Sequence, residues 1–162
     1  MKRVFYIIAL LAIFLLQGCS NNENEFDFDI WCSCKLNDKP LSCEFYAFPE
    51  GEYTSVVLND SYGSAYATLK DGSKVENVGY AYYSEDEGKY ATLSDYKNPS
   101  GLTPIREGTF YVACFPIQIG DRHPYKAKTF TKTKDKGLVI EPIFTEDSYY
   151  GVDGYKFFEW DE

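Results

Sequence analysis

The sequence has little of what common catalytic sites require. It contains one histidine and one methionine, and no G-x-S-x-G, H-E-x-x-H or glycine-rich phosphate loop occurs in it. The single histidine lies in Gly120-Asp121-Arg122-His123-Pro124, a composition typical of a solvated turn. Paired acids for glycoside hydrolysis require a spacing that a sequence does not fix. We therefore predict a non-enzymatic protein without a cofactor or metal, and a small hydrolase is the least favoured alternative.

Positive charge is also scarce. The chain has 16 Lys and Arg residues against 25 Asp and Glu residues, for a formal net charge of −9. Removal of Lys2 and Arg3 with an N-terminal signal would change that charge from −9 to −11. Such an excess of negative charge argues against nucleic acid and against anionic lipid as partners.

Long hydrophobic runs are absent except at the N-terminus, where the run is short. Lys2 and Arg3 precede 13 residues from Val4 to Leu16 that carry no charge, fewer than the roughly 20 that span a bilayer. A positively charged start, a short apolar run and a small residue near the cleavage point are typical of a secretory signal. We expect residues 1–18 to be a helical signal peptide.

The sequence Leu16-Gln17-Gly18-Cys19 that ends this run resembles the lipobox of bacterial lipoproteins. The resemblance implies that the Cys19 thiol takes a diacylglycerol, that a peptidase cleaves after Gly18, and that the new amine is acylated. Two or more acyl chains give stable anchoring. Ser20, rather than Asp, implies the outer membrane of a bacterial envelope, on its periplasmic or its outer face.

Residues 19–29 form the expected flexible tether between the anchor and a single domain at 30–162. The tether carries four acids, Glu23, Glu25, Asp27 and Asp29. It is similar to the acidic export signal of Bacteroidota surface lipoproteins, and a solvated linker explains the same composition. Both interpretations stay open.

The domain itself is expected to be all-β. Aromatic residues make up 18% of the chain and Tyr alone contributes 15 residues, while helical periodicity is absent after residue 20. Strands are expected at 28–36, 41–48, 53–58, 64–69, 75–83, 89–93, 109–118, 125–133, 138–144 and 155–160. The 109–118 segment is apolar on both faces, which predicts a central strand. About ten short strands separated by turns predict an antiparallel β-sandwich of the immunoglobulin or prealbumin-like kind.

Two short segments carry a further resemblance. Asp38-Lys39-Pro40-Leu41 and Gly108-Thr109-Phe110-Tyr111-Val112 are similar to segments of the prealbumin-like (transthyretin-like) lipoprotein domains of Bacteroidota. The resemblance covers about residues 30–120. It implies a sandwich of seven or more strands and no particular activity, because that fold hosts many functions.

Four cysteines remain besides Cys19, in a compartment that favours oxidation; they are Cys32, Cys34, Cys43 and Cys114. A turn at Asp38-Lys39 or at Asn37–Pro40 would place Cys34 opposite Cys43, within reach of a disulfide. Cys32 shares that face and could then reach Cys114. Four buried, reduced thiols are the alternative. A four-cysteine zinc site is disfavoured because the paired C-x₂-C spacing is missing.

Two groups of residues are candidate binding surfaces. Lys126, Lys128 and Lys132 alternate along one expected strand and so share a face. They could contact an anionic glycan, lipopolysaccharide or an acidic partner such as an envelope protein, although an exposed edge strand protected by lysines is the favoured interpretation.

Tyr80, Tyr82 and Tyr83 could form a stacking platform for sugar rings, although half-buried tyrosines are ordinary in strands. The favoured function is a non-catalytic binding or structural lipoprotein. A carbohydrate-binding accessory of a glycan-uptake system is the alternative.

Overall fold

The computed structural model describes residues 29–95, 103–117, 124–145 and 156–158. All regular secondary structure in these ranges is β, which confirms the predicted all-β class, and none of the described segments is a helix that could cross a membrane. The strands are β1 (Ile30–Cys32), β2 (Lys35–Leu36), β3 (Lys39–Pro40), β4 (Cys43–Pro49), β5 (Tyr53–Leu58), β6 (Ala65–Leu69), β7 (Lys74–Glu76), β8 (Gly79–Tyr83), β9 (Ala91–Thr92), β10 (Ser94–Asp95), β11 (Thr103–Pro104), β12 (Gly108–Pro116), β13 (Pro124–Lys132), β14 (Leu138–Ile140), β15 (Ile143–Phe144) and β16 (Lys156–Phe158).

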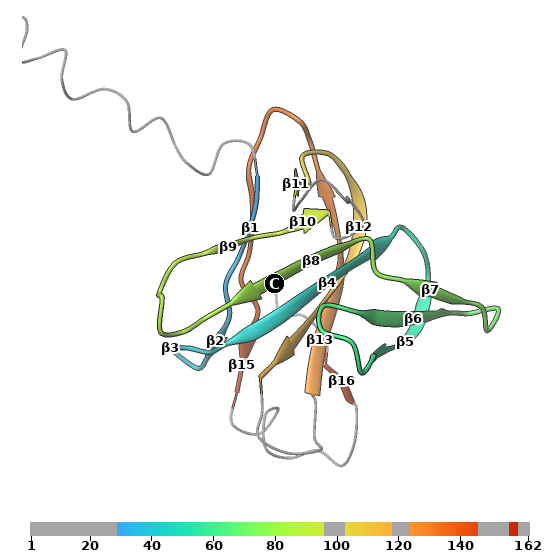
Figure 1. The fold of residues 1–162 in the computed structure, drawn as a ribbon, viewed down its shortest axis with the longest axis horizontal. Coiled ribbons are helices and arrows are strands. Elements are labelled where there is room, and N and C mark those ends of the chain that lie inside the picture. The colour runs from blue at the N-terminus through green and yellow to red at the C-terminus, as the bar shows by residue number, and fades with distance from the viewer. Residues whose placement is uncertain (1–28, 96–102, 118–123, 146–155, 159–162) are drawn as a thin grey trace, which may run out of the picture.

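The largest sheet has seven strands, in the order β11-β10-β8-β4-β12-β13-β16, and lies at the centre of the described domain, which we call the body (Figure 1). β12 lies between β4 and β13, with Ala113 opposite Tyr46 on one side and opposite Ala127 on the other. The prediction that this segment is a central strand is therefore confirmed. Its side chains are buried from Val112 onward because both faces of the sheet are covered.

One face of this sheet is covered by strands from the two ends of the chain. β1 pairs in parallel with β14, and β2 pairs in parallel with β15. Their inward side chains pack with alternate residues of the central strands to form the first core cluster, which contains Ile30, Phe45, Val112 and Phe144. These parallel pairs differ from the purely antiparallel pairing that was expected.

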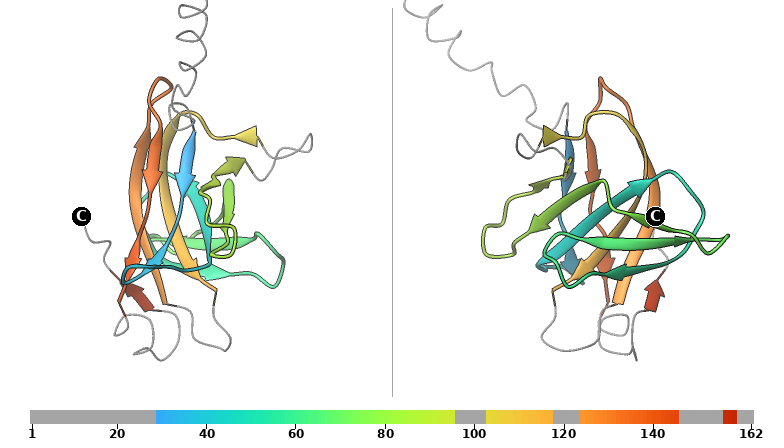
Figure 2. Two further views of the ribbon diagram at one scale, coloured as in Figure 1. Left: turned by 90° about the vertical axis from the view of Figure 1, so that its left-hand side faces the viewer. Right: turned by 45° about the vertical axis from the view of Figure 1, so that its right-hand side comes forward.

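The other face is covered by the hairpin sheet β5-β6-β7, which lies on the far side of the body from β14 in the left view of Figure 2. A second core cluster fills this interface and contains Tyr46, Phe48, Val56 and Phe115. Phe45 and Tyr46 are neighbours in β4 but belong to different clusters, because successive side chains of a strand point to opposite faces.

Two turns show how the sequence sets the hairpins. Gly72 has φ 86° in the tight turn between β6 and β7, as the Asp71-Gly72 pair predicts. Between β2 and β3, Lys35 pairs with Pro40 and Leu36 with Lys39, so the two turn residues are Asn37 and Asp38. The turn lies one residue earlier than predicted, so the partner of each β2 residue moves by two positions. Asn37 adopts the left-handed conformation that this turn requires, with φ 52°.

Candidate functional site

The three candidate tyrosines of β8 do not form one exposed surface. Tyr80 and Tyr83 are buried, with relative exposures of 6% and 5%, whereas Tyr82 is 44% exposed. Tyr80 packs in the second core cluster and donates a hydrogen bond to Glu44 Oε1 at 2.9 Å. The platform predicted from Tyr80, Tyr82 and Tyr83 is therefore corrected, because Tyr80 packs in the second core cluster and Tyr83 in the first, on opposite faces of β8.

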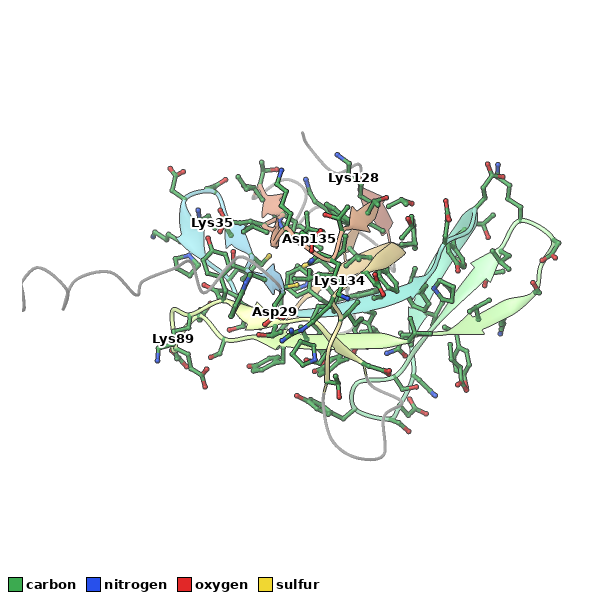
Figure 3. All side chains as sticks on the ribbon, turned by 90° about the horizontal axis from the view of Figure 1, so that it is seen from above. Asp29, Lys35, Lys89, Lys128, Lys134 and Asp135 are labelled. Atoms are coloured by element: carbon green, nitrogen blue, oxygen red, sulfur yellow. The ribbon has the colours of Figure 1, made fainter. Side chains whose placement is uncertain are left out.

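The lysines of β13 also lie differently from the prediction. β16 pairs with the first residues of β13, so that part of the strand is not an edge. Lys126 and Lys132 are buried, at 4% and 3% exposure, and only Lys128 is half-buried, at the periphery of the body in Figure 3. Neither an exposed basic stripe nor an exposed protective edge is present at Lys126 and Lys132.

Both buried lysines have local partners. Lys126 Nζ lies 5.6 Å from the centroid of the Phe144 ring, a cation–π distance. Lys132 Nζ donates to the backbone carbonyl of Arg106 at 2.9 Å and also to that of Thr133. These contacts compensate for the desolvation of the two ammonium groups.

The most distinctive chemical group in the body is a cluster of three cysteine thiols. The sulfur atoms of Cys34, Cys43 and Cys114 all lie within 4.8 Å of one another, and each residue is fully buried. Cys114 Sγ donates a hydrogen bond to Cys34 Sγ at 3.9 Å. Sulfur atoms can be seen inside the body in Figure 3, with none at its edge. We call these three residues the thiol cluster.

The thiol cluster joins two layers of the fold. Cys43 begins β4 and Cys114 lies in β12, and the pairing of Cys43 with Pro116 and of Cys114 with Phe45 makes the two cysteines diagonal neighbours on one face. Cys34 comes from the opposite layer, between β1 and β2. The backbone N–H of Leu41 donates to the Cys34 carbonyl at 2.9 Å, which fixes Cys34 opposite Leu41 rather than opposite Cys43.

The three thiols differ in acidity. Burial acts to raise the pKa of Cys34, but hydrogen bonds from the Cys114 and Cys43 thiols and from the Lys35 N–H outweigh burial and lower the pKa to about 6. Burial raises the pKa values of Cys43 and Cys114 well above the ordinary thiol value. Cys34 is thus the member of the cluster that most readily becomes a thiolate.

Cys32 is a separate buried thiol. It is fully buried in the first core cluster, and burial alone raises its pKa. It does not belong to the thiol cluster. Cys32 and the three cysteines of the thiol cluster are all free thiols in the structure. The disulfides considered from the sequence, Cys34–Cys43 and Cys32–Cys114, are therefore not formed here and stay predictions.

A polar network lies beside the thiol cluster at the surface. Glu141 accepts hydrogen bonds from Lys35 Nζ at 2.7 Å, from Tyr90 Oη at 3.3 Å and from the Ser33 hydroxyl. Partial burial acts to raise the pKa of Glu141, but the bonds from Lys35 and Ser33 lower it overall. Neither this network nor the grouping of three cysteines was expected from the sequence, because both depend on which distant segments lie side by side.

The remaining candidates lie outside the described residues. These are the lipobox residues Gly18 and Cys19 and the single histidine, His123. No family model matches the chain, and neither a curated protein nor a solved structure is significantly similar to it. The resemblances to lipoproteins and to prealbumin-like domains therefore stay predictions.

Proposed function

We propose that this chain is a lipoprotein of a bacterial outer membrane, periplasmic or surface-exposed, whose β-domain has a non-catalytic binding or structural role. The observation that carries the proposal is the 13-residue apolar run that ends in Leu16-Gln17-Gly18-Cys19. A nucleophilic sulfur is required for lipidation, and Cys19 stands where the lipobox places it. We also propose that the two layers around the first core cluster form an immunoglobulin-like or prealbumin-like sandwich.

The position of the folded body is consistent with such an anchor. The first strand begins at Ile30, so about ten residues separate it from Cys19. An acidic segment of this length holds the body in water close to the membrane surface, where an acyl anchor would keep it. The carbohydrate-binding alternative has less support than the sequence suggested, because Tyr80 and Tyr83 are buried.

Replacement of the lipidated cysteine tests this proposal. The native protein should partition into the detergent phase, and its N-terminal peptide should begin at Cys19 and carry fatty acyl chains in mass spectra. Cys19→Ala should retain Met1 or the apolar run and should carry no acyl mass. Ser20→Ala serves as the matched control and should be lipidated as the native chain is.

A native product that carries no lipid, or that begins at a residue other than Cys19, would refute the proposal. Protease treatment of intact cells then separates the two faces of the membrane, since only a surface-exposed body is cleaved.

A further inference from the structure

We propose that Cys34, Cys43 and Cys114 form a three-coordinate binding site for a soft monovalent metal ion, Cu(I). This inference goes beyond the proposed function and does not depend on the lipid anchor, because all three ligands lie within the folded domain. Cu(I) is the first-row ion that thiolate ligands favour without requiring a fourth donor.

The separation of the sulfur atoms fits a single ion. Metal–thiolate bonds are about 2.3 Å long, so three sulfurs in a plane around one ion lie about 4.0 Å apart. The Cys34 and Cys114 sulfurs are 3.9 Å apart, and every pair in the thiol cluster is within 4.8 Å. Movements of about 1 Å or less, within the reach of side-chain rotation, would therefore bring all three sulfurs to bonding distance.

The surroundings of the cluster favour a soft ion with few ligands. Leu41, Phe45, Tyr83 and Phe144 belong to the same core cluster as the three cysteines, and no carboxylate or imidazole of the described residues joins the sulfur group. Hard ions such as Mg²⁺ and Ca²⁺ require oxygen ligands. Structural Zn²⁺ takes four ligands, and Cys32 is not among the grouped thiols.

Paired strands position the ligands, and a lysine lies on the neighbouring strand. Cys43 and Cys114 lie on adjacent central strands, and Cys34 approaches from the covering layer. Lys126 pairs directly with Cys114 and places its ammonium group over the Phe144 ring within the same interface. A cation there partly offsets the negative charge of thiolates bound to a monovalent ion. Each thiol that binds as a thiolate releases its proton to solvent.

Anaerobic titration of the reduced, full chain with Cu(I), in competition with a colorimetric Cu(I) chelator, tests the site. Because the cluster is fully buried, Cu(I) is added both to the native protein and during refolding from guanidinium. The wild-type chain should bind one ion per molecule. Cys34→Ala, Cys43→Ala and Cys114→Ala should each weaken binding by about tenfold or more, the smallest loss expected for a residue that orients or binds a metal.

Cys32→Ala is the matched control, because it removes a fully buried thiol of the same core that is outside the cluster. It should bind Cu(I) as tightly as the wild type. X-ray absorption on the loaded wild-type chain should show three sulfur neighbours, a result that does not depend on whether the variants fold.

Four outcomes would overturn the proposal. The first is that Cu(I) does not bind under either loading condition, and the second is that the wild type and the three cluster variants bind it equally. The third is that the chain binds Zn²⁺ tightly but does not bind Cu(I). The fourth is a disulfide between two cluster cysteines in protein that was isolated with its thiols blocked at lysis. The last result would show that two of the three proposed ligands are joined in a disulfide and are not available to bind a metal.

Discussion

Asn77 is a buried polar side chain whose removal should cost a large part of the stability of the domain. It is 2% exposed and directly follows β7. Its Oδ1 accepts the backbone N–H of Ala65 at 3.0 Å, and its Nδ2 donates to the carbonyls of Gly63 at 3.0 Å and Gly79 at 3.2 Å. One side chain thus satisfies three backbone groups, two in the segment that leads into β6 and one at the start of β8.

Asn77→Ala would leave these three groups without their partner. A buried backbone group that loses its hydrogen bond costs about 1–3 kcal/mol. We take the lower value for each group, since water can reach some of them, and expect a loss of about 3 kcal/mol in the free energy of unfolding. For an m-value of about 2 kcal/mol/M, the urea midpoint should fall by about 1.5 M.

Urea unfolding of the purified protein, followed by tryptophan fluorescence, measures this change. Asn59→Ala is the matched control, because Asn59 is exposed and both of its side-chain bonds lie at the surface, from Nδ2 to Ser64 Oγ at 3.4 Å and from the Asp60 N–H to Oδ1 at 2.9 Å. It should change the stability by less than about 0.5 kcal/mol. Equal stabilities of Asn77→Ala and Asn59→Ala would refute the reasoning.

A second substitution at the same position separates the acceptor from the donor. Asn77→Asp keeps an oxygen for the Ala65 N–H but places a carboxylate oxygen against the Gly63 and Gly79 carbonyls. Repulsion and burial should raise the pKa of this carboxyl above the unfolded value of about 3.9. The stability of Asn77→Asp relative to the wild type should therefore improve as the pH falls, and a loss that is independent of pH would contradict this account.

Two further predictions concern a glycine and an ion pair. Gly108→Ala should lower the melting temperature more than Gly72→Ala. Both glycines have positive φ, but only at Gly108 would an added Cβ clash with a neighbour, because it would lie 2.6 Å from the Phe110 ring. Equal decreases of the melting temperature in the two variants would contradict this reasoning. The lowered pKa of Glu141 means that its ion pair with Lys35 stabilises the fold above the unfolded carboxyl pKa and that this contribution is lost as the pH falls through the folded pKa. The difference between the urea midpoints of wild type and Glu141→Gln should therefore be largest at pH 7 and should shrink as the pH falls below the ordinary carboxyl pKa, and a difference that does not change with pH would show that the charge of Glu141 has no effect.

Local patterns were sufficient for the approximate positions of the longer strands and of the tightest turn. They did not predict the breaks within 28–36, 75–83 and 138–144, nor the two-residue strands β3, β10 and β11. The Asp71-Gly72 pair supplies the positive φ that the β6–β7 hairpin requires. The apolar residues on both faces of β12 identified a strand covered on both sides. Each of these features depends on a few adjacent residues, so a single sequence contains the necessary information.

The alternation of residues along a strand correctly predicted which side chains share a face. It did not predict whether that face is exposed or covered by another part of the chain. Lys126, Lys128 and Lys132 do alternate on one side of β13, but Phe144 from β15 packs against the first of them. The same limitation applies to Tyr80 in β8, which the β5–β7 sheet covers. The segment that covers a strand is set by long-range packing, and periodicity carries no information about it.

The thiol cluster could not be predicted because it combines two long-range arrangements. The pairing of β4 with β12 brings Cys43 near Cys114, and the placement of the β1–β2 segment over that sheet adds Cys34. A local hairpin model gave Cys34 a different neighbour, because the turn residues are Asn37 and Asp38 and the register shifts accordingly. A change of one residue in a turn is enough to reassign a cysteine partner.

The parallel pairing of β1 with β14 sets an order in which the molecule can be completed. Ile30 pairs with Leu138, which lies more than one hundred positions later in the sequence, so β1 and β14 can pair only after residue 138 has been synthesised. Contacts this distant in sequence slow folding. Until Leu138 has been synthesised, β1 has only β9 as a partner among the described strands, through the pairs Trp31–Thr92 and Cys32–Ala91. The sheet β14-β1-β9 is therefore completed only after the strands of the β5-β6-β7 sheet are already present.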